Sequence, residues 1–382
     1  MPEMRVAFII DSLKLGGAER VLLRWASWCR QKGWQVLVIT RQESEMDAYP
    51  LPEGIERVVE PTVSSQLAWL GWFAFPLRVF ALRQLLYRRH IDLAVGVTTL
   101  PAVKLLLAAM GLSLRTVVSE RNYPPAKSLS LPWHCLRRIT YPWADLHLVQ
   151  TRETGIWLRK NCAVHRQQLL PNSVTWPLPD REPLLEPDDY ISPMHPLILA
   201  VGTKAHQKGF DRLIPVFTEL GRRDPHLHLA MVGLAPGDYR GLDQQGWLRQ
   251  LLGDDPVLQQ RLLMPGVSGS MARWYARATV FVLPSRYEGF PNVLLEAMAA
   301  GCACIARDCL TGPADLIRHG ENGLLLSSQA TSEDWVEAIA GLLADPDQRL
   351  RLGQSASRVR ERYDAALLRH DFLEALQQLH HG

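Results

Sequence analysis

No stretch of this 382-residue sequence is long and apolar enough to predict a transmembrane helix. The longest uncharged run, residues 61–77, contains prolines, Ser64, Ser65 and Gln66, and it is shorter than the roughly 20 apolar residues that a membrane span requires. The six cysteines follow neither a disulfide nor a metal-ligand spacing, and no secretory signal precedes the first apolar segment. The sequence therefore predicts a protein of the reducing cytoplasm.

Two motifs of cofactor and metal chemistry are also missing. The chain has no G-x-G-x-x-G fingerprint, which argues against a dinucleotide-dependent dehydrogenase. No Asp-x-Asp motif follows a predicted strand, and the pairs Asp188-Asp189 and Asp254-Asp255 fall in linker or loop contexts. We therefore expect no metal ion and no cofactor.

Charge is divided unevenly along the chain. Residues 1–175 contain 22 Lys and Arg against 13 Asp and Glu, whereas residues 176–382 contain 20 against 26. A basic first half favours contact with an anionic surface or substrate. The length suggests two domains, and residues 176–196, with six prolines, are typical of an extended linker. We predict an N-terminal domain over residues 1–178 and a C-terminal domain over residues 179–364.

Short apolar runs alternate with longer amphipathic stretches in both halves, which is the pattern of strand-helix-strand units in a parallel sheet. The predicted strands of the first half are residues 5–10, 35–40, 92–97, 115–119 and 145–150. Those of the second half are residues 197–201, 227–232, 279–283, 304–306 and 324–326. We therefore predict an α/β fold with two doubly wound, Rossmann-like parallel sheets facing a cleft. Such sheets bind ligands beyond the carboxyl ends of their strands.

The most informative segment, residues 287–301, has the sequence YEGFPNVLLEAMAAG. Pro291 and Gly301 stand where a helix should begin and end, so that Glu288 lies on a loop and Glu296 inside the helix. We expect three amides of the first helical turn to lack partners and, with the helix dipole, to form an anion site: those of Asn292, Val293 and Leu294. Two carboxylates on either side of an anion site suit a nucleotide diphosphate sugar.

This segment closely resembles the signature of the retaining glycosyltransferases of family 4, which have the GT-B architecture. Four further segments resemble motifs of that family and follow each other in the expected order. They are Gly16-Gly17-Ala18-Glu19-Arg20-Val21, Pro171-Asn172-Ser173-Val174, Val201-Gly202 with Gln207-Lys208-Gly209-Phe210-Asp211, and Gly312-Pro313-Ala314-Asp315 with Asn322-Gly323-Leu324-Leu325. The resemblance covers almost the whole chain. It also implies that a terminal helix, residues 365–382, packs back on the first domain.

The resemblance implies roles for individual residues of the donor site. Glu288 binds hydroxyls of the donor sugar, Glu296 binds the ribose, and Lys208 is the cation beside the diphosphate, so that Lys208 and Glu288 are candidate catalytic residues. The other candidate donor-binding residues are Gly16, Gly17, Thr203, Lys204, Gly289, Phe290, Pro291, Asn292, Val293 and Leu294. Thr203 stands where the family usually has an arginine, and either Lys204 or His206 could replace that arginine.

Residues 119–122, Ser-Glu-Arg-Asn, follow the fourth predicted strand, at the place where many relatives carry a histidine near the reacting sugar. Glu120 is the third candidate catalytic residue, and Arg121 and Asn122 are candidates for acceptor binding. Neither Glu120 nor Arg121 is assigned as a base. The alternative is that Glu120 and Arg121 form an ion pair that only packs the loop.

An aromatic and basic segment lies in the cationic half. Its aromatic and aliphatic members are Trp69, Leu70, Trp72, Phe73, Phe75, Val79, Phe80 and Leu82, and its basic members are Arg78, Arg83, Arg88 and Arg89. This composition suits the surface of an anionic membrane, and it suits a helix packed on the sheet equally well. Both interpretations stay open.

The sequence thus predicts a cytoplasmic, metal-independent, retaining glycosyltransferase, peripheral on the inner face of the cytoplasmic membrane. Its donor would be a UDP-hexose or UDP-N-acetylhexosamine, and its acceptor a lipid-linked or cell-surface polysaccharide precursor such as that of lipopolysaccharide; no nucleic acid is expected as a partner. Two alternatives are a non-catalytic nucleotide-sugar-binding partner of another glycosyltransferase and an NAD-dependent dehydrogenase.

Overall fold

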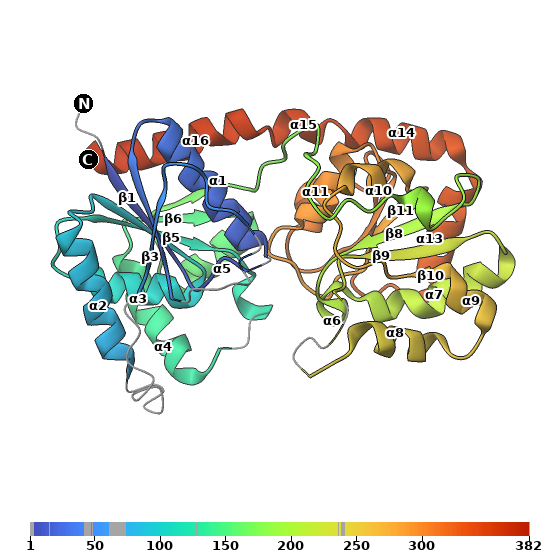
Figure 1. The fold of residues 1–382 in the computed structure, drawn as a ribbon, viewed down its shortest axis with the longest axis horizontal. Helices are drawn as coiled ribbons and strands as arrows, with labels where there is room; N and C mark the ends of the chain where they lie inside the picture. Colours follow the sequence, from blue (N-terminus) through green and yellow to red (C-terminus); the bar gives the residue numbers. More distant parts are fainter. Residues whose placement is uncertain are drawn as a thin grey trace. The chain divides into compact units, whose positions relative to one another are not determined.

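A computed structural model describes residues 4–14, 16–41, 47, 49–60, 74–126, 129–235, 237 and 241–381. The chain forms two compact units (Figure 1). Unit 1 comprises residues 1–172 and 366–382, and unit 2 comprises residues 173–365. Each unit is described by itself below.

Unit 1 is built on a parallel sheet of seven strands in the order β3-β2-β1-β4-β5-β6-β7. Its strands are β1 (Arg5–Ile10), β2 (Gln35–Thr40), β3 (Glu56–Val59), β4 (Leu93–Val97), β5 (Arg115–Glu120), β6 (Leu146–Val149) and β7 (Gln167–Leu169). The inner strands are apolar and buried, as expected of a sheet that helices cover on both faces. The order reverses between β1 and β4, which makes the carboxyl ends of these two strands the switch point of the sheet.

The helices of unit 1 are α1 (Gly17–Gln31), α2 (Phe75–Arg88), α3 (Thr99–Ala109), α4 (Leu131–Thr140), α5 (Arg152–Cys162) and α16 (Ala365–His381), with short 3₁₀ turns at Pro124–Ala126 and Tyr141–Trp143. Figure 1 shows α16, in red, beside α1. The contact is aromatic: the rings of Trp25 and Phe372 stack with their centroids 4.8 Å apart. The terminal helix thus completes the core of unit 1.

Unit 2 repeats this plan with six parallel strands in the order β10-β9-β8-β11-β12-β13. They are β8 (Leu197–Val201), β9 (His228–Val232), β10 (Leu262–Leu263), β11 (Val280–Leu283), β12 (Cys304–Arg307) and β13 (Leu324–Leu326). Its helices are α6 (Ala205–Lys208), α7 (Phe210–Arg223), α8 (Gln244–Leu252), α9 (Pro256–Arg261), α10 (Met271–Arg277), α11 (Asn292–Ala299), α12 (Pro313–Leu316), α13 (Ser332–Ala344), α14 (Pro346–Ala356) and α15 (Val359–Arg362), with a 3₁₀ turn at Pro187–Asp189.

Alternation along β8 explains why helices cover both faces of the second sheet. Ile198 and Ala200 belong to one hydrophobic core, with side chains of α7 and α13. Leu197, Leu199 and Val201 belong to the other, with side chains of α10 and α11. The order of this sheet reverses between β8 and β11, so the loops that follow these strands lie at its switch point.

The predicted α/β class and both parallel sheets are confirmed. Three short strands are missing from the prediction: β3, β7 and β10. All three lie at sheet edges. Their sequences, ERVV, QQL and LL, are too short or too polar to give a hydrophobic pattern.

The prediction of an extended linker over residues 176–196 is wrong. Leu185 and Ile191 pack in the second hydrophobic core of unit 2. The backbone of Leu185 accepts hydrogen bonds from Ser270 and Trp274, at 2.8 and 2.9 Å. This proline-rich segment is therefore packed on unit 2. Proline suits such an extended segment, because its ring fixes φ and it has no backbone N–H that would need a hydrogen-bond partner.

Candidate functional site

Lys208 is the last residue of α6, in the connection that follows β8. Gly209 ends the short helix in the left-handed conformation, with φ 68°, and α7 begins at the next residue. The aliphatic stem of Lys208 lies over Gly202, where an added Cβ would be 2.6 Å from Cγ of Lys208. Glycine at position 202 therefore leaves room for the lysine to extend toward the switch point.

Glu288 lies on the loop between β11 and α11, and it is only 5% exposed. Its Oε1 atom accepts hydrogen bonds from Nζ of Lys208, at 2.7 Å, and from the hydroxyl of Ser285, at 2.6 Å. Among the described residues, none donates a hydrogen bond to Oε2 of Glu288. The hydroxyl of Thr311 donates to the backbone carbonyl of Glu288, which ties the loop before α12 to this site. The predicted pair of catalytic candidates therefore meets directly.

Arg286 joins the loops that carry these two residues. Its guanidinium donates to both carboxylate oxygens of Asp211, at 2.7 and 2.6 Å, and to the carbonyl of His206, at 2.7 Å. Its backbone N–H donates to the carbonyl of Gln207, at 2.9 Å. Burial raises the pKa of the Asp211 carboxyl, but the hydrogen bonds and charge of Arg286 outweigh burial and hold that pKa below its ordinary value.

Glu296 lies inside α11, as predicted, and its Oε2 accepts a hydrogen bond from the hydroxyl of Tyr275, at 3.2 Å. The start of the helix differs from the prediction in two ways. Pro291 is the residue before the first helical turn, not its first member. The amide of Asn292 donates to the carbonyl of Phe290, and that of Leu294 donates to the carbonyl of Pro291, both at 3.0 Å. The prediction that all three amides lack partners is therefore wrong.

The segment that replaces the usual arginine is exposed. Thr203, Lys204 and His206 all have exposed side chains beside the carboxyl end of β8. Gln244, at the start of α8, holds their backbone by accepting from the amide of Ala205, at 2.7 Å, and donating to the carbonyl of Thr203, at 3.2 Å. Gln244 was not predicted as a site residue, because a glutamine in a polar stretch gives no sequence signal.

Gly16 and Gly17 follow β1 in unit 1, and α1 begins at Gly17. The carboxylate of Glu19 folds over Gly16, since a Cβ at Gly16 would collide with it. The carbonyl of Gly16 accepts a hydrogen bond from the hydroxyl of Tyr49, at 3.3 Å. The glycine loop therefore has a tightly packed backbone at the switch point of the first sheet.

Glu120 is the last residue of β5 and is 1% exposed. Its carboxylate accepts hydrogen bonds from Thr99, at 3.1 Å, and from Tyr141, at 2.7 Å. Burial and the charge of Glu120 raise the pKa of Tyr141 well above its ordinary value. These hydrogen bonds within unit 1 give the Glu120 carboxylate a structural role. Its catalytic role stays a prediction. The side chains of Glu120 and Arg121 form no hydrogen bond or ion pair with each other, so the alternative of an ion pair between them is not confirmed.

Arg121 is 7% exposed, and its Nη2 donates to the amide oxygen of Asn172. Its guanidinium lies 5.1 Å from the centroid of the Trp25 ring. Burial lowers the pKa of Arg121 to about 9, against the opposing charges of Glu19 and Glu120. Asn122, by contrast, is exposed. The acceptor-side candidates thus include one buried and one accessible residue.

Thr98 and Thr99 follow β4 at the switch point of unit 1, and they were not predicted as site residues. Thr98 has φ 71°, which is unusual for a β-branched residue. Its amide donates to the carbonyl of Ser119, at 3.0 Å, which ties the ends of β4 and β5 together. Their position directly after a predicted strand was the available signal.

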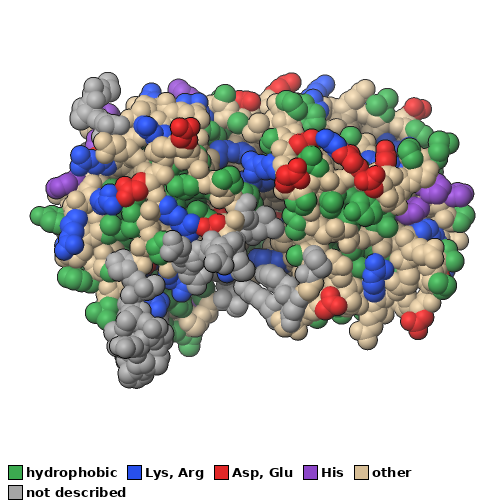
Figure 2. All heavy atoms as spheres, viewed as in Figure 1, with side chains coloured by type: hydrophobic (Ala, Val, Ile, Leu, Met, Phe, Trp, Pro, Cys, Tyr) green, Lys and Arg blue, Asp and Glu red, His purple; other side chains and the backbone are tan. Residues whose placement is uncertain are grey.

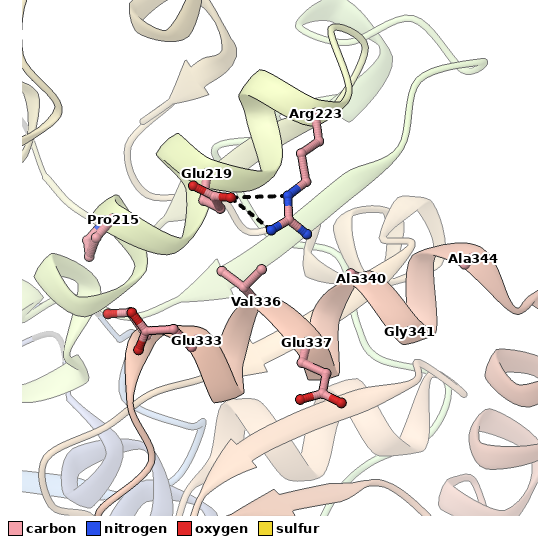
Figure 3. Close-up of a pocket in the computed structure, with 10 residues that line it drawn as sticks. Pro215, Glu219, Arg223, Glu333, Val336, Glu337, Ala340, Gly341 and Ala344 are labelled. Atoms are coloured by element: carbon pink, nitrogen blue, oxygen red, sulfur yellow. Dashed lines mark hydrogen bonds and ion pairs between the residues drawn. The ribbon is translucent and has the colours of Figure 1, made fainter.

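A pocket of unit 2 lies between α7 and α13 (Figure 3). Glu219, Arg223, Val336 and Glu337 are among its lining residues, and none of the predicted site residues lines it. Figure 3 shows Glu219 and Arg223 bonded to each other, at 2.8 Å. With Arg223 already paired and several carboxylates around it, this pocket does not suit a phosphate ligand.

Within the described ranges, no group of three or more His, Cys, Asp and Glu side chains is arranged to hold a metal ion. In the same part of the chain, no helix has the length and apolar character needed to cross a bilayer.

Comparison with known protein families gives two matches. A family profile described as "Glycosyltransferase Family 4" matches residues 15–175, and one described as "Glycosyl transferases group 1" matches residues 187–359. The two matches follow each other and together cover most of both units.

The sequence is also similar to individual curated proteins. An exopolysaccharide phosphotransferase of Streptomyces coelicolor is 29% identical over 76% of this chain and 29% of that protein. The chain spans between 29% and 44% of the length of the first curated relatives that it matches. An N-acetylgalactosamine-N,N'-diacetylbacillosaminyl-diphospho-undecaprenol 4-alpha-N-acetylgalactosaminyltransferase of Campylobacter jejuni is 23% identical over 97% of this chain and 99% of that protein.

Solved structures agree on the fold. Anabaena HepE in complex with UDP aligns with a TM-score of 0.80 at 19% identity, over 98% of this chain and 100% of that one. At this identity the likeness establishes the two-domain architecture and leaves the ligand to separate argument.

Proposed function

Because the chain belongs to glycosyltransferase family 4 and has the GT-B fold, we propose that it transfers a sugar from a nucleotide diphosphate sugar with retention of configuration. The proposed donor is a UDP-hexose or UDP-N-acetylhexosamine, and the proposed acceptor is a lipid-linked or cell-surface polysaccharide precursor. The observation that carries this proposal is the contact of Lys208 with Glu288 at the switch point of the second sheet. A cation beside a carboxylate at this position suits a ligand in which a diphosphate adjoins hydroxyl groups.

In the proposed mechanism, the bond between the anomeric carbon and the diphosphate oxygen breaks while the acceptor hydroxyl oxygen bonds to the same face of that carbon. The departing diphosphate takes the hydroxyl proton. Lys208 stabilises the negative charge that grows on the diphosphate, and the dipole of α11 contributes through its N-terminal end. We propose that this charge stabilisation replaces a metal ion.

The carboxylates hold the two ends of the donor. Oε2 of Glu288 is oriented by the two bonds that Oε1 accepts, and it would accept from hydroxyls of the sugar. Glu296 would accept from the ribose, next to the hydroxyl of Tyr275. Lys204 or His206 would replace the arginine at the position of Thr203, although a lysine cannot form the bidentate bonds of a guanidinium. A role of Gly16 and Gly17 in donor binding stays a prediction.

The choice of UDP and of a lipid-linked acceptor rests on relatives. Anabaena HepE has been solved with UDP and with UDP-glucose. The name of the Campylobacter jejuni relative describes a diphospho-undecaprenol acceptor. Arg121 and Asn122 are the proposed acceptor-side residues of this chain.

We also propose that unit 1 rests on the inner surface of the cytoplasmic membrane through α2 and α4. Leu82 and Leu86 of α2 are buried, whereas Phe80 is 60% exposed. On α4, Leu131 is 80% exposed, and the rings of Phe75 and Trp133 join the two helices at 5.0 Å.

Charge on these helices matches an anionic lipid surface. Neither contains Asp or Glu, and outside the core they carry Arg78, Arg83, Arg88 and Arg138, whereas Arg137 is buried. Figure 2 shows basic side chains among hydrophobic ones on the visible face of unit 1. Residues 61–73 of the aromatic segment lie outside the described residues.

The membrane proposal is tested by sedimentation with vesicles that contain phosphatidylglycerol. We expect salt-sensitive binding that a Phe80→Ser/Leu131→Ser variant loses and a Leu350→Ser variant, which alters an exposed leucine of unit 2, retains. Equal binding to neutral vesicles, or equal binding by both variants, contradicts it.

The catalytic proposal is tested by release of free nucleotide from UDP-, GDP- and ADP-sugars in the presence of a chelator. We expect turnover with a UDP-sugar that survives chelation and is lost in Lys208→Ala. Proton NMR of the product should show the anomeric configuration of the donor. Binding of the donor without any turnover, in the presence of candidate acceptors, would instead support the non-catalytic alternative.

A further inference from the structure

The two residues of the proposed catalytic pair belong to loops that are 80 residues apart in the sequence. Lys208 follows β8, and Glu288 follows β11. A long lysine side chain can reach many positions, so its placement depends on how the two loops are held. Arg286 provides most of the bonds between them.

Each bond of Arg286 fixes a different part of the first loop. One pair of bonds, at 2.7 and 2.6 Å, reaches Asp211 in the first turn of α7. Another bond, at 2.7 Å, reaches the carbonyl of His206 within α6. The backbone N–H of Arg286 adds a bond of 2.9 Å to Gln207. Lys208 thus stands between two anchored neighbours on one side and Asp211 on the other.

Close backbone packing completes this junction. Gly209 would collide with the carbonyl oxygen of Pro284 if it carried a Cβ, and its φ of 68° also favours glycine. The side chain of Gln207 donates to the carbonyl of Tyr287, at 3.4 Å. The residues on either side of Lys208 therefore contact the residues that lead to Glu288.

We propose that Arg286, through its paired bonds to Asp211, is a positioning residue that sets the ammonium of Lys208 against Glu288 and toward the donor diphosphate. The inference rests on the proposed function of Lys208. Arg286 is not a substitute for the arginine that Thr203 replaces, because its paired N–H groups already bind Asp211 and a backbone carbonyl. A bidentate pair has a fixed geometry, so it can hold one loop against another where a lysine could not.

The test compares Arg286→Gln, Arg286→Lys and Asp211→Asn in the full chain. The measured quantities are the affinity for UDP, the affinity for uridine, kcat and KM for the donor, and the melting temperature. The matched control is Arg223→Gln, because Arg223 pairs with Glu219 at the other end of α7.

We expect all three variants to lose about 10- to 100-fold in UDP affinity and in kcat/KM while uridine affinity stays within about twofold, because misplacement of Lys208 affects only the diphosphate end of the ligand. Arg286→Lys should not rescue, and the control should match the wild type. Parallel losses of UDP and uridine affinity, or wild-type UDP affinity in Arg286→Gln, would overturn the inference.

Lys208→Ala separates this inference from the proposed function. If Lys208→Ala weakens UDP binding and Arg286→Gln does not, only the positioning role fails. If Lys208→Ala also leaves UDP binding unchanged, the proposed role of Lys208 itself fails. Should a variant not fold, as judged by its melting temperature, Asp211→Asn gives the comparison, since it retains the shape of the carboxyl group.

Discussion

The Nζ atom of Lys208 lies 2.7 Å from Oε1 of Glu288, and the two residues follow the strands between which the order of the second sheet reverses. Both side chains are largely removed from water. A buried pair of this kind contributes little net stability, because desolvation offsets much of the attraction. Its position at a switch point fits the proposed role of the pair in donor binding.

Replacement of Lys208 by alanine should lower kcat/KM for the donor by about 100-fold or more, because the growing charge on the diphosphate loses its cation. Steady-state kinetics of nucleotide release measures this loss. Lys160→Ala, which removes an exposed lysine of α5, is the control and should leave the kinetics unchanged. Comparable activity of Lys208→Ala and wild type would contradict the assignment.

The Asp211 carboxyl should titrate below its ordinary range, and Arg286→Gln should raise its pKa. A carboxyl group with a lower pKa in the folded than in the unfolded state adds stability above the unfolded value of about 4, and this stability is lost as the pH falls through the folded value. Carbon-detected NMR of the carboxyl group follows the titration. A normal pKa in the wild type would disprove this electrostatic account.

Glu120→Gln should reduce the free energy of unfolding by about 1–2 kcal/mol, because the bonds from Thr99 and Tyr141 lose a charged acceptor. Its turnover should stay within a few-fold of the wild type. Urea denaturation and donor kinetics measure the two quantities. A loss of turnover in a protein of unchanged stability would instead support the predicted catalytic role of Glu120.

Phe372→Ala should destabilise unit 1 by about 3–5 kcal/mol, because it removes a fully buried ring that stacks on Trp25. Leu367→Ala changes an exposed position of the same helix and should cost far less. Chemical denaturation that is followed by tryptophan fluorescence compares them. Equal effects of the two substitutions would mean that α16 is not part of the core.

A thiol reagent should label one cysteine of the native protein. Cys135 is exposed, whereas the other five are buried. Burial raises the pKa of Cys302 and Cys309 to about 12, which further lowers their reactivity. Cys135→Ser should abolish native labelling, and unfolding should reveal the remaining thiols. Fast labelling of Cys135→Ser would contradict the described burial.

The parts of the fold that could be predicted are those with a strong local pattern. The apolar runs at residues 5–10 and 197–201 became β1 and β8 with the predicted bounds. The edge strands β3, β7 and β10 escaped prediction because their stability comes from pairing with a neighbour. Residues 176–196 show the opposite error, since prolines suggested a free linker where tertiary contacts bind the chain to unit 2.

The candidate site divides in the same way. Glu288 and Lys208 were identified through motifs, but motifs alone do not reveal that their side chains bond to each other. Asp211 belongs to a segment that resembles a family motif and Arg286 does not, and only tertiary structure joins them. At α11 the sequence located the helix but not the bonds of Asn292 and Leu294, because capping depends on the local backbone angles.

The decisive experiment is a crystal structure of the protein with an intact nucleotide diphosphate sugar. In that structure we expect Nζ of Lys208 to lie within hydrogen-bonding distance of a diphosphate oxygen, with Glu288 bonded to hydroxyls of the sugar and Glu296 to those of the ribose. A diphosphate bound elsewhere, with Lys208 still bonded only to Glu288, would contradict it.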